Sequence, residues 1–402
     1  MASNILNGKL KVGVVGCGRM GLEHIKNLAE DERCGPENVF IFDVNESAME
    51  SARDRYGVQI VTGLDTLLRN PEIAAVVVAS SNRSHSEMAI RALDEGKHVL
   101  LEKPMALNEV DARRVVLAAR RSGKILHVGF ELRNSLFPRK VKAMKAELGE
   151  LVSAQVVEYR GHFWPQWKGS KTDGGSMFLM ETCHLIDLFR WWTESEVAEV
   201  HAVGSVKNLV PHYDFPDTQF TTLVFRDGFV GHISLCHVRS AIPSEFSYED
   251  PLGNDCLRDE KLGHQYEYSL IGTKGAVRYL PLKGQCNLYR HELQPDGSFW
   301  QRLVPGFETM EFSDQKESIH NVKAEIEDFL DAVTGDGCGS LDPDDALKTH
   351  LVCYAAEEAL RCRRPVILDD GEETLDRNSV SDDEPNQLME PSSLEEIGLQ
   401  LH

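Results

Sequence analysis

The segment LKVGVVGCGRMG, residues 10–21, joins a β-branched run directly to an amphipathic stretch. Residues 10–15 predict a buried strand, and the residues that follow the glycines predict a helix. At this spacing the first glycine turns the chain, the second lets the backbone approach a pyrophosphate, and the third packs helix against strand. The free N–H groups of the helix then face the anion. The segment predicts a dinucleotide-binding loop, with contacts from Gly16, Gly18, Arg19, Met20 and Gly21.

A carboxylate stands where the adenosine ribose of such a cofactor is expected. The predicted strand Val39–Phe42 ends at Asp43, roughly 20 residues beyond the glycine loop, where an acidic side chain accepts from the ribose 2′-hydroxyl. The same charge would repel a 2′-phosphate. We therefore predict NAD rather than NADP; the alternative for Asp43 is a cap at the end of the strand.

Composition excludes several classes of protein. A chain of 402 residues fits two domains, and its net charge of −21 argues against nucleic acid or an anionic membrane as a partner. Nine cysteines without a CxxC or a Cys/His ligand spacing predict reduced thiols in a cytoplasm and no metal site. We expect no secretory signal, because the N-terminus lacks a charged region followed by an apolar one. We expect no membrane span, because no apolar run approaches ~18 residues.

Short β-branched runs alternate with amphipathic stretches in the first third of the chain. The predicted strands are 11–15, 39–42, 58–61, 74–79, 98–101 and 125–128, and the predicted helices are 20–29, 46–56, 86–94 and 109–121. This alternation predicts right-handed βαβ units and a doubly wound parallel sheet, a Rossmann domain over residues 1–129.

A different pattern follows a linking helix at 138–148. Strands are predicted at 151–159, 197–206, 219–225, 229–236, 266–271, 276–280 and 286–290, with helices at 177–192, 318–333 and 343–361. We predict an α+β domain with a large, mostly antiparallel sheet over residues 130–368, whose exposed face pairs with another subunit. Residues 369–402 hold eleven acidic residues and one arginine, and predict a flexible tail.

Polar residues follow the predicted parallel strands at their carboxyl ends, where doubly wound sheets bind ligands. The cofactor contacts predicted there are Ser80, Asn82, His85, Glu102 and Lys103. Lys103 ends an apolar strand and precedes Pro104, so we expect it to be partly desolvated. Desolvation would lower its pKa and suit it to proton exchange with a substrate hydroxyl. The alternative is a surface lysine.

A second cluster lies on the predicted helix 177–192. Glu181, His184 and Asp187 are spaced by three residues, which places them on adjacent parts of one helical face. Histidine is suited to take a proton near neutral pH, and a carboxylate one turn away would orient it. The alternative is a buried structural histidine.

Together these motifs resemble the glucose–fructose oxidoreductase / inositol dehydrogenase (GFO/IDH/MocA-type) family over about residues 10–368. The motifs are GCGRMG at 16–21, Asn82 with His85, GKHV at 96–99, EKPMA at 102–106, Gly174-Gly175 before HLID at 184–187, and IGTKG at 271–275. The resemblance implies hydride exchange between a nicotinamide dinucleotide and a carbinol carbon of a sugar or polyol. It implies that Lys103 contacts the reacting hydroxyl, that His184 is the general base, and that Arg133 lies near the active-site entrance. It also implies dimers or tetramers formed through the second sheet.

One departure from the family's motif leaves the identity of the substrate open. Many relatives carry an acid four residues before the histidine, where this chain has Met180, with the carboxylate next door at Glu181. A single step rotates a helical side chain by about 100°. The predicted substrate contacts are Glu181, Asp187, Arg133, Arg160, His162 and Trp164, the last three in a stretch that packing alone would also explain.

The hypothesis from sequence is an NAD-dependent oxidoreductase acting on a sugar, inositol or related polyol. A redox-assisted glycoside hydrolase or lyase is the alternative, because the same cofactor can oxidise a sugar carbon transiently. A non-catalytic sugar sensor is disfavoured, because both Lys103 and His184 are present.

Overall fold

A computed structural model describes residues 5–6, 9–159, 166–205, 207–208, 210, 212–237, 265–293, 296, 299–300, 308–312, 315–335 and 342–369. Contacts divide the chain into one unit over residues 1–368 and a second over 369–402. The predicted acidic tail lies, from residue 370, outside the described part of the chain. Within the described ranges, no helix combines the length and the apolar character that crossing a bilayer requires.

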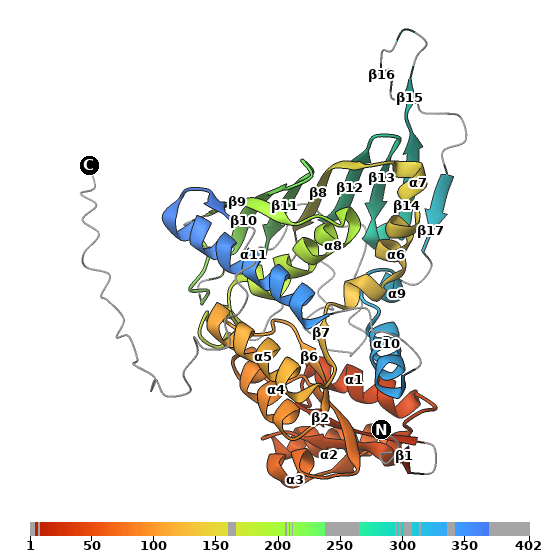
Figure 1. Ribbon diagram of the computed structural model, residues 1–402, viewed down its shortest axis with the longest axis vertical. Helices are drawn as coiled ribbons and strands as arrows, with labels where there is room; N and C mark the ends of the chain where they lie inside the picture. The colour runs from red at the N-terminus through yellow and green to blue at the C-terminus, as the bar shows by residue number, and fades with distance from the viewer. Residues whose placement is uncertain are drawn as a thin grey trace, which may run out of the picture. The chain divides into compact units, whose positions relative to one another are not determined.

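A parallel sheet forms the N-terminal part of the first unit, with strand order β4-β3-β2-β5-β6-β7 and β1 antiparallel to β2 (Figure 1). The strands are β1 (Ile5–Leu6), β2 (Lys9–Val15), β3 (Val39–Phe42), β4 (Gln59–Ile60), β5 (Ile73–Val78), β6 (His98–Glu102) and β7 (Leu126–Gly129). The helices are α1 (Arg19–Glu30), α2 (Glu46–Tyr56), α3 (Leu64–Leu68), α4 (His85–Asp94) and α5 (Glu109–Ser122). The strand order reverses between β2 and β5, which is where such sheets bind ligands.

Both faces of this sheet are covered. Along β5, Val76 and Val78 join the core beneath α4 and α5, whereas Ala75 and Val77 join the core beneath α1. Helix α10 (Val322–Thr334), from the far end of the unit, packs beside α1 on that second face (Figure 1). Burial on both faces explains why β5 is apolar throughout.

A nine-stranded sheet dominates the rest of the unit, in the order β17-β14-β13-β12-β8-β11-β10-β9-β18. The strands are β8 (Leu151–Tyr159), β9 (Val197–Gly204), β10 (Thr218–Phe225), β11 (Val230–Cys236), β12 (Gln265–Gly272), β13 (Gly275–Leu280), β14 (Gln285–Arg290), β17 (Glu308–Glu311) and β18 (Val366–Ile367), and β15 (Glu292–Leu293) pairs with β16 (Phe299–Trp300). All neighbours pair antiparallel except β8 and β11.

Helices cover one face of the second sheet. They include α6 (Leu136–Ala143), α7 (Lys145–Leu148), α8 (Cys183–Thr193), α9 (Gln315–Ile319) and α11 (Pro343–Cys362). Helix α8 packs tightly on β11, since a Cβ on Gly231 would lie 2.5 Å from the Phe189 ring. Figure 1 shows α8 and α11 crossing the same face.

The predicted fold class is confirmed, and the differences from prediction lie in the helices. Helix α3 went unpredicted because five residues carry too little periodicity. The predicted helix 177–192 opens with a π-helical turn, Phe178–Thr182, before α8. The predicted helix 318–333 is two helices, because Asn321 caps α10 by accepting from the Ala324 N–H at 3.1 Å. Helix 138–148 likewise divides into α6 and α7.

Candidate active site

The glycine loop has the shape that a pyrophosphate requires. Gly16 has φ +105°, and a Cβ there would overlap the Ala79 carbonyl; a Cβ on Gly21 would overlap the Gly16 carbonyl. A Cβ on Gly18 would meet no atom within 4 Å, so the space outside the loop is open. Arg19 begins α1 and is exposed, and Met20 is half-buried. The three glycines thus fit the predicted roles in the turn, the approach of a ligand and the helix–strand packing, and their contacts with the cofactor stay a prediction.

Asp43 follows β3 and is held by the backbone. Its Oδ2 accepts from the Cys17 N–H at 2.6 Å and its Oδ1 from the Asn45 N–H at 2.8 Å. The strand-end cap is therefore present. A carboxylate offers about four acceptor sites, so Asp43 retains capacity for two ribose hydroxyls while the backbone fixes its position beside the glycine loop.

Three of the predicted cofactor contacts support the backbone around the site. The Asn82 Nδ2 donates to the Gly174 carbonyl at 2.7 Å. His85, 1% exposed, lies between the carbonyl oxygens of Pro104 (2.8 Å from Nδ1) and Ser80 (3.1 Å from Nε2). Burial lowers the pKa of His85. Ser80 itself is half-buried, with its Oγ 2.8 Å from that of Ser84. Asn82 and His85 thus fix the loop that flanks Lys103.

Lys103 lies at the carboxyl end of β6, and its Nζ donates a hydrogen bond to the Met180 carbonyl, one turn before His184. The sequence predicted a lowered pKa, and this is wrong. Burial does lower the pKa of Lys103, but the carboxylates of Glu181, Glu131 and Glu102 outweigh burial and raise it. Lys103 is therefore an ammonium group at neutral pH, a donor rather than a base.

His184 is 5% exposed and packs edge-on against the Phe130 ring, with centroids 5.9 Å apart. Burial lowers its pKa to about 4, so the imidazole is neutral at pH 7. Glu131 Oε2 lies 3.6 Å from its Nδ1. Glu131 belongs to another element than His184, and the charge of Glu181, on the same helix, also acts on His184. The orientation of His184 by an acid on its own helix stays a prediction.

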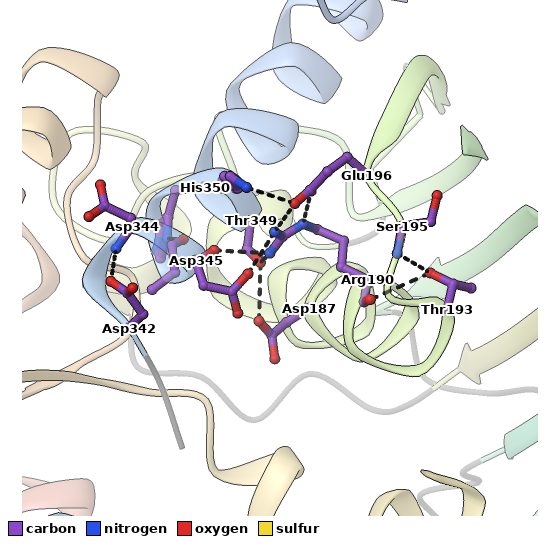
Figure 2. Close-up of polar contacts among 12 residues, drawn as sticks. Asp187, Arg190, Thr193, Ser195, Glu196, Asp342, Asp344, Asp345, Thr349 and His350 are labelled. Atoms are coloured by element: carbon purple, nitrogen blue, oxygen red, sulfur yellow. Dashed lines mark hydrogen bonds and ion pairs between the residues drawn. The ribbon is translucent and has the colours of Figure 1, made fainter. Parts of the chain in front are cut away.

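Asp187 and Arg133 bind each other. Arg133 donates to both Asp187 oxygens, at 2.6 and 2.7 Å, and the two side chains are 5% and 1% exposed. Figure 2 shows the surrounding network, in which Thr349 donates to Asp187 at 3.1 Å and Arg190 to Asp345 at 2.7 Å. Their prediction as substrate contacts is not supported, because these bonds use both groups to tie η3, α8 and α11 together.

The remaining predicted substrate contacts lie partly inside and partly outside the described residues. Glu181 is half-buried, and among the neighbouring charges it raises the pKa of Lys103 most, so it belongs to the same site. Arg160, His162 and Trp164 lie outside the described residues. Sequence reasoning missed Lys168, whose pKa burial and the Lys103 charge lower to about 8. Its only sequence signal was a place beside Trp167 in a polar aromatic stretch.

A buried cluster behind Lys103 was also missed. Glu102 Oε1 and His24 Nε2 form a hydrogen bond of 2.7 Å. One ring nitrogen of His24 and one carboxylate oxygen each of Glu102 and Glu325 lie within 4.8 Å of one another. Neither oxygen of Glu325 has a hydrogen-bond partner among the described residues, and burial raises its pKa well above the usual range. These residue types suit a divalent metal, but a proton on Glu325 already balances the charge of the cluster.

Comparisons with known proteins agree with this geometry. Residues 10–130 match the model of an oxidoreductase family described as an NAD-binding Rossmann fold, and residues 142–368 match the C-terminal α/β domain of that family. The myo-inositol 2-dehydrogenase of Thermotoga maritima is 27% identical over 369 residues, which cover 90% of this chain and 99% of that protein.

Solved structures share the fold. GenD2 from gentamicin A biosynthesis, solved in complex with NAD, superposes with a TM-score of 0.71 at 24% identity, over 92% of this chain and 99% of that one. A levoglucosan dehydrogenase, solved with NADH and levoglucosan, gives 0.70 at 20% identity, over 89% and 99%. The family matches span both sheets and the glycine loop. The chain belongs to this GFO/IDH/MocA oxidoreductase family, and its cofactor is NAD.

Proposed function

We propose that this protein oxidises one carbinol of a cyclic polyol, an inositol or a pyranose-like sugar, with NAD as acceptor. The observation that carries the proposal is the division of charge between a half-buried lysine and a buried histidine. Lys103 is held as an ammonium donor by neighbouring carboxylates, and His184 is held as a neutral base by burial. A hydroxyl that is losing its proton needs both groups at once.

The residues present fit the cofactor. The open space outside Gly18 and the N-terminus of α1 would take the pyrophosphate, and Asp43 would take the adenosine ribose. Ser80 and Lys103 follow β5 and β6, the strands beyond the switch point, so they would flank the nicotinamide half. When bound, NAD supplies the hydride acceptor.

The chain's own groups would move the proton. Lys103 would donate to the reacting oxygen and stabilise the negative charge that develops there, while His184 removes the hydroxyl proton through Nε2. Glu181 and Lys168 place an acceptor and a second donor beside Lys103. Such paired donors and acceptors suit neighbouring hydroxyls of a ring. The relatives named as inositol dehydrogenases support this substrate class.

Self-association through the second sheet belongs to the proposal. Four exposed apolar side chains lie on the sheet face away from α8 and α11, with exposed fractions of 61%, 38%, 37% and 47% for Val203, Phe220, Val230 and Ile271. Val203 and Phe220 are direct cross-strand partners. Burying this row against a second copy would give a homodimer, or a tetramer if a further surface pairs. The unpaired cysteines, buried except for the half-buried Cys362 within the described residues, favour a cytoplasmic location.

A substrate panel tests the proposal. Purified protein and NAD are offered myo-inositol, scyllo-inositol, D-chiro-inositol, glucose, levoglucosan and an aryl glycoside, and NADH formation is followed by absorbance. We expect NADH from at least one free polyol and none from the His184→Gln variant. Release of the aryl group without net NADH would favour the redox-assisted hydrolase, and no reaction across the panel would refute the dehydrogenase.

A further inference from the structure

A carboxylate on another element faces His184. Glu131 lies in the short helix η3 (Glu131–Asn134) that follows β7, and it is 4% exposed. Its Oε2 is 3.6 Å from His184 Nδ1, and its Oε1 is 2.8 Å from His320 Nδ1. The Nδ1 of His184 has no hydrogen-bond partner among the described residues. Glu131 therefore presents one oxygen to each of two histidines.

The backbone holds this arrangement in place. His320 lies in the break between α9 and α10, and the next residue, Asn321, donates its N–H to Ser135 Oγ at 3.1 Å. Ser135 Oγ in turn donates to the Glu131 carbonyl at 3.1 Å. The break that sequence reasoning took for continuous helix thus fixes His320 beside Glu131.

We propose that Glu131 and His320 are positioning residues for His184, an inference that rests on the proposed function. Glu131 accepts the Nδ1–H of His184, which leaves the lone pair on Nε2 for the substrate hydroxyl. His320 donates to the other oxygen and stops the carboxylate from turning away. The gap of 3.6 Å closes to a hydrogen bond when substrate binds, as catalytic hydrogen bonds commonly do.

Charge supports the same roles. Burial alone would raise the pKa of Glu131, but the cationic and imidazole neighbours lower it to about 2, so it stays ionised. Among the described residues, the ionisable groups that interact with Glu131 or His184 include Lys103, Glu181, Cys183, His320, Glu325 and Tyr268. The proton of the substrate O–H bond moves to His184 Nε2, which turns the imidazole into an imidazolium. An ionised Glu131 stabilises that positive charge and stays ionised itself. No electrons move between Glu131, His184 and His320.

The test compares four variants with the substrate that the panel selects, beginning with myo-inositol. Glu131→Gln should lower kcat by about 10²–10⁴-fold, with KM and NAD affinity nearly unchanged. His320→Ala should lower kcat less, and His320→Asn, whose Nδ2 can still donate to Glu131, should recover most of the loss. His201→Ala is the matched control, because His201 is also 46% exposed and 2.7 Å from a carboxylate, Glu199, on β9.

A spectroscopic measurement separates positioning from a merely structural role. In ¹⁵N-histidine-labelled protein, the resonances absent from His184→Gln identify His184. We expect the Nδ1–H tautomer in the wild type with NADH bound and its loss in Glu131→Gln. An unchanged tautomer together with wild-type kcat in Glu131→Gln would overturn the inference, whereas an active His184→Gln would overturn the proposed function instead.

Discussion

Replacing Lys103 with Met removes one positive charge and one hydrogen-bond donor from the centre of the site. The carboxylates of Glu181, Glu131 and Glu102 keep the Lys103 amine protonated, and the resulting charge lowers the pKa of His184. The substitution therefore acts on the rate in two ways: the developing alkoxide loses its donor, and the base becomes easier to protonate.

The magnitude follows from these two effects. Loss of one preorganised donor to a developing oxyanion costs about 10²–10³-fold in kcat. Without the Lys103 charge, the pKa of His184 rises from about 4, although burial still holds it below the usual value of an imidazole. Protonated His184 cannot accept a proton, so the acidic limb of kcat/KM moves to higher pH in the variant.

The assay measures kcat/KM by NADH formation from pH 4 to 9, with NAD binding followed by protein fluorescence. Lys323→Met is the charge-matched control, since Lys323 is 67% exposed on α10. NAD affinity should stay within about threefold of wild type, because the glycine loop and Asp43 carry the adenosine half. A Lys103→Met enzyme with wild-type kcat/KM, or one whose acidic limb stays in place, would refute the reasoning.

Three further predictions concern the cofactor, stability and assembly. Asp43→Ser should weaken NAD binding and raise the ratio of NADP to NAD turnover, and an unchanged ratio would remove the role of Asp43 in selecting NAD. The folded protein holds a proton on Glu325 that the unfolded chain releases above a pKa of about 4.5. The free energy of unfolding therefore falls as pH rises above that value. The total loss is about 1.4 kcal/mol for each unit by which folding raises the pKa of Glu325. Glu325→Gln mimics the protonated group and should raise Tm more at pH 8 than at pH 5; a lower Tm in the variant, with wild-type Tm raised by added Zn²⁺, would indicate a metal at this cluster. Phe220→Glu should halve the mass measured by light scattering while the circular dichroism stays native, whereas a monomeric wild type would contradict the proposed pairing of sheets.

Local pattern was enough to predict the parallel sheet, the glycine loop and the places of Lys103 and His184. These features depend on residues close together in sequence: a strand, its terminal polar group and the helix that follows. The position of Asp43 after β3 was predictable for the same reason.

Long-range partners could not be predicted this way. Glu131 faces His184 from 53 residues away and His320 from 189. The raised pKa of Lys103 likewise depends on how many carboxylates the fold gathers around it, whereas the sequence shows only the apolar strand that precedes Lys103. Arg133 was predicted as a substrate contact from the family resemblance, and Asp187 from its spacing along the predicted helix. Their bidentate pairing becomes visible only when η3 and α8 are placed side by side.

Transfer of a labelled hydrogen tests the central claim most directly. The polyol selected by the panel, deuterated at the reacting carbon, is mixed with enzyme and NAD, and the reduced cofactor is analysed by mass spectrometry. We predict one deuterium on the nicotinamide ring of NADH from the wild type and none, over the same time, from His184→Gln. Unlabelled NADH, or equal labelling by the His184→Gln variant, would contradict a direct hydride transfer supported by Lys103 and His184.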